Sequence, residues 1–313
     1  KRGDGTRAFL KHERISGLSL AFFAAAGLCA ARPQASAAHE ADGAVRKRLP
    51  GLMAASLARS RVEVLTFFRN WLSLVFNMAL PVLMMLVFGA VFNQKIPGTD
   101  VDYRLLFISG MIGVGVMSTT FQSLALSVTS DRDEGIIRRL AASPMPRIAY
   151  FVGITVKALI TTVFEVIILM LLGMVLYGLP MPSDAVRWLT LVWVVLLGVS
   201  SCSLLGIAYT ALIPNSRAAP GATAPPFMIL QFVSGVFFPL AMIPAVLAYV
   251  GYAFPLLWMA KGLRFVFLPD FLASSEPSGS WDLGLVAIVL IAWTVVGGVL
   301  AVLAFRWRGQ RVK

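Results

Sequence analysis

Long apolar runs alternate along this chain with short segments that are rich in charge. A helix that crosses a bilayer needs about 20 consecutive apolar residues, and six runs have close to that length. The pattern therefore predicts an all-α polytopic membrane protein with six transmembrane helices. The predicted spans are Trp71–Phe92, Leu105–Val128, Ile148–Gly178, Trp188–Leu212, Ala222–Leu240 and Leu283–Phe305.

Two more elements are predicted at the membrane surfaces. Leu57–Asn70 places Leu57 and Leu65 on one helical face and Glu63 on the other, which predicts an amphipathic helix in the plane of the membrane. The alternative is a cytoplasmic extension of the first span. Ala241–Phe267 is apolar but interrupted by prolines, which predicts a re-entrant pair of short outer helices between spans five and six. The alternative there is an apolar loop on the surface.

The basic residues indicate how the spans are oriented. With both termini inside the cell, the cytoplasmic segments contain Arg132, Arg138, Arg139, Arg147 and Arg217, as well as the basic ends of the chain. The outer loops mix a few basic residues with acidic ones. Loops rich in Lys and Arg remain in the cytoplasm, so we predict cytoplasmic termini and a multi-pass protein of the plasma membrane.

Composition supports this interpretation. Hydrophobic residues make up 58% of the 313 residues and charged residues 13%, whereas soluble domains contain about 45–50% and about 25%. The net charge of +12 is explained by basic residues gathered on the cytoplasmic side of a lipid bilayer. The composition therefore indicates no nucleic-acid partner.

Residues 1–52 do not fit the membrane pattern. Ile15–Ala31 is apolar and precedes Ala35-Ser36-Ala37, which is typical of a signal peptide or a marginal span. Either would export the basic residues that follow. We therefore predict that 1–52 is a poorly ordered or non-native extension, and that 53–313 forms the six-span domain.

Few side chains suggest chemistry. The sequence has no phosphate-binding loop, and its two histidines precede the first span, so we predict no catalytic residue and no metal site. Glu165 is the one acid well inside a predicted span, where it must be paired, hydrated or protonated. It is either a structural partner within the bundle or part of a conducting path. Gln122 and Gln231 are candidates for hydrogen bonds between helices.

The charged segment, Asp131–Pro146, has six charged residues in its first nine positions, with Ile136, Ile137 and Leu140 among them. This pattern predicts a short amphipathic helix along the cytoplasmic surface, ended by Pro144 and Pro146. The alternative is a solvated loop between two spans.

Several motifs together resemble a known family. They are the amphipathic helix before span one, Asp131-Arg-Asp-Glu-Gly-Ile-Ile-Arg-Arg-Leu-Ala-Ala-Ser-Pro144, Phe232-Val-Ser-Gly-Val-Phe-Phe-Pro239 with Ile243-Pro244, and Phe254-Pro255-Leu256 with Gly262-Leu-Arg264. From about Leu57 to the C-terminus the chain resembles the permease subunit of type-2 ABC transporters, a group that includes bacterial drug and polysaccharide exporters. Asp131 and Asp133 depart from the pattern, because many members carry Glu there.

The resemblance implies a permease that is not itself an enzyme and binds no cofactor. Two separate ATPase subunits would bind ATP and Mg, and a second permease copy would complete a homodimer or heterodimer in the bacterial inner membrane. The cargo would be a hydrophobic drug, a lipid or a glycan. Coupling to the ATPase is implied for Asp131, Arg132, Asp133, Glu134, Gly135, Ile137, Arg138, Arg139, Leu140 and Pro144.

The resemblance also implies a substrate path along the second and fifth spans. The tentative path residues are Gln122, Glu165, Gln231, Phe232, Phe237 and Phe238, and the outer re-entrant segment contains Pro239, Pro244, Phe254, Pro255 and Arg264. The alternative function is a secondary transporter driven by protons, with Glu165 as the carrier. A membrane-bound enzyme is disfavoured because the spans contain no histidine.

Overall fold

The computed structural model describes residues 52–304, except positions 70, 93, 97–98, 143–146, 239 and 241–242. The predicted extension 1–52 lies outside the described residues apart from its last residue, and so do Pro144, Pro146 and Pro239. The interpretations of those positions therefore stay predictions.

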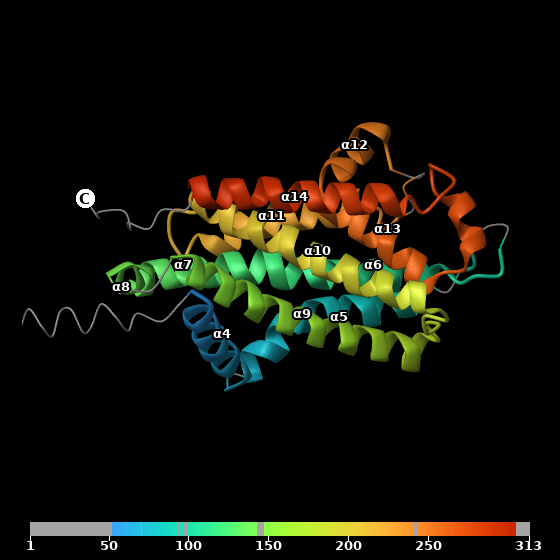
Figure 1. The fold of residues 1–313 in the computed structure, drawn as a ribbon. Coiled ribbons are helices and arrows are strands. Elements are labelled where there is room, and N and C mark those ends of the chain that lie inside the picture. Colours follow the sequence, from blue (N-terminus) through green and yellow to red (C-terminus); the bar gives the residue numbers. More distant parts are fainter. Residues whose placement is uncertain are drawn as a thin grey trace, which may run out of the picture. The chain divides into compact units, whose positions relative to one another are not determined.

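The described part of the chain is helical, and the only β-type pairing within it is a single bridge between Lys95 and Asp102 (Figure 1). The all-α class is thereby confirmed. In chain order the elements are α4 (Leu52–Arg69), α5 (Trp71–Val91), α6 (Tyr103–Met117), the π-helical turn η1 (Ser118–Gln122), α7 (Ser123–Asp133), α8 (Ile136–Ala142), α9 (Arg147–Tyr177), α10 (Ala185–Tyr209), η2 (Thr210–Leu212), α11 (Ala219–Val233), α12 (Ala245–Ala253), α13 (Pro255–Phe267), η4 (Asp270–Ser275) and α14 (Leu283–Ala304).

Four continuous helical segments among the described residues are long and apolar enough to cross a bilayer. They are Tyr103–Asp133, Ala149–Tyr177, Ala185–Leu212 and Leu283–Ala304. The pair α12 and α13 would add a fifth if it forms one span, although the two helices are bent by 86° relative to each other. Within α5 the apolar segment is shorter, Met78–Val91. The chain is a polytopic helical membrane protein, and the count of six spans stays a prediction.

The fifth predicted span, Ala222–Leu240, ends earlier than its apolar residues indicate. α11 stops at Val233, and Gly235 follows with a φ of +73°, a left-handed conformation that glycine adopts readily. The N–H of Ser234 donates to the carbonyl oxygen of Leu230 at 3.0 Å and closes the last turn. The helix ends because the backbone changes direction at Gly235. Hydropathy cannot predict this end, because it depends only on how apolar the residues are.

The Tyr103–Asp133 segment forms the centre of the bundle. Of the residues in the most apolar stretch of this segment, 83% are buried. The share is 22% in the corresponding stretch of α14. α6 packs against α5, α9 and α13 (Figure 1). Gly206 of α10 lets that helix approach η1, because a Cβ there would stand 2.9 Å from the carbonyl oxygen of Phe121. This close packing holds the central helix among its neighbours.

α4 turns its polar face toward the bundle. Ser60 and Glu63 are buried on this helix, which packs against α9, whereas Leu57 and Leu65 are 68% and 53% exposed. In a soluble protein an apolar face would be turned inward, but in a membrane protein an outward apolar face can contact lipid. The predicted amphipathic helix is present, while its orientation in the membrane plane stays a prediction.

Candidate functional site

A left-handed glycine separates the two helices of the charged segment. α7 ends at Asp133, Gly135 has a φ of +74°, and α8 begins at Ile136. The N–H of Gly135 donates to the carbonyl oxygen of Arg132 at 3.2 Å. No other group stands within 4 Å of the position that a Cβ on Gly135 would occupy. The backbone conformation, rather than a shortage of space, therefore favours glycine here.

α8 is held to the bundle by its apolar side. Ile137 is 1% exposed and belongs to a hydrophobic cluster with Tyr150 and Ile154 of α9 and Ile207 of α10. Leu140 is half-buried and packs against the same cluster. These contacts place Ile137 and Leu140 against the bundle, so a force on α8 would reach α9 and α10 through packed side chains.

Two charges of the segment are turned toward the neighbouring end of α10. The guanidinium of Arg132 donates to the carbonyl oxygens of Thr210 and Ile213, at 3.1 and 2.6 Å. The carboxylate of Asp133 accepts a bond from the backbone N–H of Ser216 at 2.6 Å. Carbonyl groups at a helix end lack partners inside the helix, and a basic side chain can satisfy them. Arg132 and Asp133 therefore join α7 to η2 and to the chain that follows it.

Glu134, Arg138 and Arg139 are exposed charges in and beside α8. Arg139 donates to the carbonyl oxygen of Glu134 at 3.2 Å, and the carboxylate of Glu134 accepts a bond from the hydroxyl of Ser130 at 2.8 Å. They belong to the ten residues for which the family resemblance implies coupling to the ATPase. Their position on an anchored short helix makes them accessible to one.

A polar cluster joins the charged segment to α4 and α9. The hydroxyl of Tyr150 donates to the carboxylate of Asp131 at 2.9 Å, and the guanidinium of Arg59 lies over the Tyr150 ring at 5.6 Å. Arg59 also pairs with Glu63, which accepts a second bond from Lys157 at 3.3 Å. The sequence analysis did not expect this cluster. The Arg59–Glu63 spacing of four residues was its one visible signal.

Glu165 is fully buried against η1. The hydroxyl of Thr119 donates to its Oε2, and its Oε1 has no hydrogen-bond partner among the described residues. Gly115 leaves room for the carboxyl group, because a Cβ there would lie 3.0 Å from Oε1. The residue faces protein rather than lipid. This position is compatible with both interpretations, a structural partner and a path residue.

The other tentative path residues differ in exposure. The rings of Phe232 and Phe237 stack with centroids 4.8 Å apart, and Phe237 is buried. Phe232 and Phe238 are 48% and 46% exposed. Gln122 is half-buried in η1, and Gln231 is buried in α11. The exposed aromatic surface of this set is therefore confined to Phe232 and Phe238.

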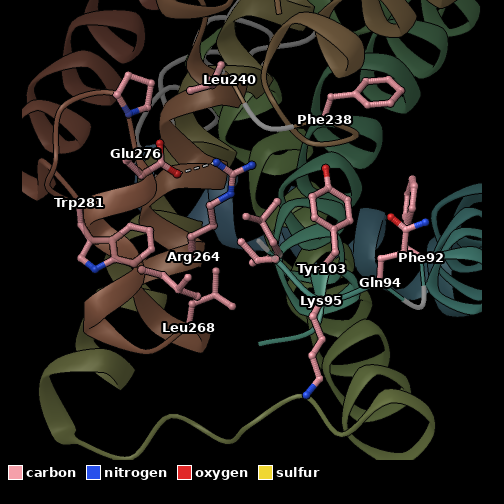
Figure 2. A pocket seen from close by; sticks show the side chains of 14 residues that line it. Phe92, Gln94, Lys95, Tyr103, Phe238, Leu240, Arg264, Leu268, Glu276 and Trp281 are labelled. Atoms are coloured by element: carbon pink, nitrogen blue, oxygen red, sulfur yellow. Dashed lines mark hydrogen bonds and ion pairs between the residues drawn. The ribbon is translucent and has the colours of Figure 1, made fainter. Parts of the chain in front are cut away.

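A cavity of about 290 Å³, named the outer cavity after the predicted orientation of the spans, lies at the end of the bundle where α6 begins (Figure 2). It is enclosed by the segment that precedes α6, by α13 and the chain after it, and by the turn after α11. The lining residues are Phe92, Gln94, Lys95, Ile96, Tyr103, Leu106, Phe238, Leu240, Arg264, Leu268, Leu272, Glu276, Pro277 and Trp281.

A buried ion pair forms one wall of the outer cavity. Arg264 donates to the carboxylate of Glu276 at 2.8 Å, and the two side chains are 3% and 8% exposed (Figure 2). The guanidinium also donates to the carbonyl oxygen of Gly235. The hydroxyl of Tyr103 donates to the carbonyl oxygen of Phe237 at 3.0 Å. Two side chains, Arg264 and Tyr103, therefore hold the turn after α11 through its carbonyl oxygens.

Two further ion pairs fasten the outer loops. Lys261 is buried and donates to the carboxylate of Asp282 and to the hydroxyl of Ser278, the latter at 2.7 Å. Hydrogen bonding to the Lys261 ammonium lowers the pKa of Asp282 to about 2. Arg187 pairs with Asp270 at 2.8 Å. Each basic group comes from a helix and each acidic group from the chain between α13 and α14.

The remaining outer residues mark where helices begin. Pro244 and Phe254 are the N-cap residues of α12 and α13, and Pro255 is the first residue of α13. Proline at a first helical position has no N–H that would need a partner. Phe254 also stacks on Trp293 of α14, with ring centroids 5.5 Å apart. The predicted breaks in this apolar stretch therefore agree with the helix boundaries.

The sequence analysis missed the outer cavity and its ion pairs. Lys261 and Arg264 interrupt an apolar run three residues apart, so they lie on one face of a helix. A charge within an apolar run needs a partner. That signal could have directed attention to the acids that follow, Glu276 and Asp282, although the sequence cannot show that the loop folds back over α13.

The long apolar helices, joined by the anchored charged segment, are those of a polytopic membrane protein. The family described as ABC-2 type transporter matches residues 56–268, more than half of the chain, and the chain belongs to this family. It is a permease domain of an ABC transporter, and such domains work with ATP-binding subunits. A search among curated proteins finds no match.

Proposed function

We propose that this chain is the membrane subunit of an ATP-driven exporter in a bacterial plasma membrane, and that a separate ATPase docks on α8. Two such ATPase subunits would bind ATP and Mg, and a second permease copy would complete the assembly. The cargo would be a hydrophobic drug, a lipid or a glycan-type molecule. Family membership supports the permease role, and the geometry of the charged segment supports the docking position.

The observation that carries the proposal is the division of α8 into two sides. Ile137 is buried against the bundle, while Arg138 and Arg139 are exposed beside Glu134. The segment follows directly from the most buried helix of the bundle. A push on the exposed charges would therefore be delivered through packed contacts to α6, which borders the predicted path.

The test replaces single exposed charges and measures ATP hydrolysis by the assembled complex. A charge-assisted hydrogen bond contributes roughly 1.5–3 kcal/mol, so Arg138→Ala or Glu134→Ala should weaken coupling about tenfold. Asp100→Ala is the matched control, because Asp100 is an exposed charge before α6, at the opposite end of the central helix. Unchanged coupled hydrolysis in both the Arg138 and the Glu134 variants would overturn the docking assignment.

Family membership favours ATP-driven transport over a proton-coupled carrier that uses Glu165. Glu165→Gln keeps the shape of the side chain and removes its ability to carry a proton. Export that persists after ATP depletion, but is lost in this variant and on collapse of the proton gradient, would favour the alternative.

A further inference from the structure

We propose that the outer cavity is a binding site for a small amphipathic molecule, or for the end of a longer amphiphile, with an apolar body and a polar head that forms hydrogen bonds. The site is built entirely within one chain. The inference does not depend on which partner drives transport, so it can stand even if the docking position on α8 is wrong.

The size of the cavity suits such a ligand. Its volume is about 290 Å³. An engineered apolar cavity of about 150 Å³ is large enough to bind benzene. Protein interiors otherwise contain few voids larger than one water molecule. A space of this volume among packed helices is therefore large enough to hold an organic ligand.

The walls indicate an apolar body. Nine lining residues are apolar, and they come from three separate parts of the chain: Phe92, Ile96, Leu106, Phe238, Leu240, Leu268, Leu272, Pro277 and Trp281. Water gains few hydrogen bonds in such surroundings, whereas a hydrocarbon or aromatic group gains contacts with every wall. The cavity should therefore bind an apolar group in preference to water.

The polar groups indicate the head. Arg264, Glu276 and Tyr103 line the same cavity and supply charged and hydroxyl groups (Figure 2). The Nε of Arg264 is buried without a hydrogen-bond partner among the described residues. A ligand oxygen that enters the cavity would be met by the Arg264 guanidinium, the Lys95 ammonium and the Tyr103 hydroxyl. A hydroxyl, carboxyl or amide head supplies such an oxygen.

Ligand binding would be sensed by the turn after α11. Arg264 and Tyr103 hold the carbonyl oxygens of Gly235 and Phe237, and Phe238 of the same turn is a wall of the cavity. A ligand that shifts Arg264 would therefore shift the turn that carries the aromatic residues of the tentative path. This link to transport, unlike the site itself, rests on the proposed function.

The test uses the full chain in lipid nanodiscs and two probes, a twelve-carbon fatty acid that bears a diazirine and the corresponding fatty alcohol. After irradiation, the labelled peptides are mapped by mass spectrometry. Saturable labelling of peptides within 92–106 and 264–281 supports the site. Stronger labelling by the acid would assign the head contact to a basic side chain, Arg264 or Lys95, whereas equal labelling would assign it to a hydroxyl-compatible contact.

Gln94→Trp is the main variant, because Gln94 is exposed and lines the cavity, so a larger side chain can fill it without disturbing the core. Labelling should fall at least fivefold. Val302→Trp is the matched control, since Val302 is 77% exposed on α14. Leu272→Trp provides a second way to fill the cavity. Non-saturable labelling, or labelling unchanged in both cavity variants at an unchanged unfolding temperature, would overturn the proposal.

Native mass spectrometry of the purified chain distinguishes the two sources of such a ligand. A lipid-sized adduct that is lost in Gln94→Trp would identify a membrane lipid as the occupant. Saturable probe labelling without any adduct would indicate that the occupant is not a membrane lipid. It would then be a molecule that binds from solution or a molecule that the transporter exports.

Discussion

At the end of the bundle that carries α8, charged side chains bond to backbone groups and to neighbouring helices, while Glu134, Arg138 and Arg139 are exposed. At the end where α6 begins, basic and acidic side chains pair with each other beneath the loops and enclose a cavity. The first arrangement presents charge to a partner. The second withdraws charge from solvent and surrounds a space. Under the two proposals above, the first end docks the ATPase and the second end binds a ligand.

The largest effect should come from breaking the buried pair of the outer end. Arg264→Ala leaves the Glu276 carboxylate buried without its partner, which should lower the free energy of unfolding by about 3–5 kcal/mol. The double variant Arg264→Met with Glu276→Leu should lower the free energy of unfolding by less than Arg264→Ala does. Thermal unfolding of the purified chain measures both. Lys95→Ala, an exposed charge in the same cavity wall, should cause no measurable change. Equal costs for Arg264→Ala and Lys95→Ala would contradict the comparison.

The next effect separates inward from outward charges at the α8 end. Tyr150→Phe removes the hydroxyl that donates to Asp131 and should cost about 1–3 kcal/mol, because the carboxylate stays largely enclosed. Arg138→Gln removes an exposed charge and should change the free energy of unfolding by no more than about 0.5 kcal/mol. Chemical denaturation of both variants checks the difference. A large loss of stability in Arg138→Gln would show that this side chain is structural.

Each end of the bundle has a glycine in the left-handed conformation, so alanine substitutions can be compared between the two ends. Gly135 at the α8 end and Gly279 at the outer end have φ values of +74° and +67°, and neither has another group near the position of an added Cβ. Alanine should therefore cost about 1–2 kcal/mol at each position through backbone strain alone. Only Gly135→Ala should also reduce coupled ATP hydrolysis. Reduced coupling in Gly279→Ala as well would mean that the effect reflects lost stability.

The smallest effect concerns pH at the outer end. The Lys261 ammonium lowers the pKa of Asp282 to about 2, so the pair contributes stability above the unfolded-state pKa of about 4 and loses it as pH falls toward 2. Because Asp282 is partly in solvent, the contribution should be about 1 kcal/mol at most. The unfolding temperatures of the unmodified chain and Asp282→Asn should differ at pH 5 and converge near pH 2. A constant difference would exclude this linkage.

Hydropathy predicted the helical class and most helix positions, because the length and apolarity of a span are properties of consecutive residues. It misplaced the end of α11, since Gly235 lies among apolar residues on both sides. The exposed and buried faces of α8 followed from local spacing. The pairing of Arg264 with Glu276 and of Lys157 with Glu63 did not, because both depend on how distant segments pack.

The most direct test of the central claim is a photo-crosslink from α8. Replacing Arg138 by a photoreactive phenylalanine derivative, in the complex formed in cells, should give a crosslinked product with the ATPase. The same replacement at Asp100 should give none. The account predicts an ATPase peptide joined to position 138. Equal crosslinking from both positions, or none from 138 in a complex that still co-purifies, would contradict docking on α8.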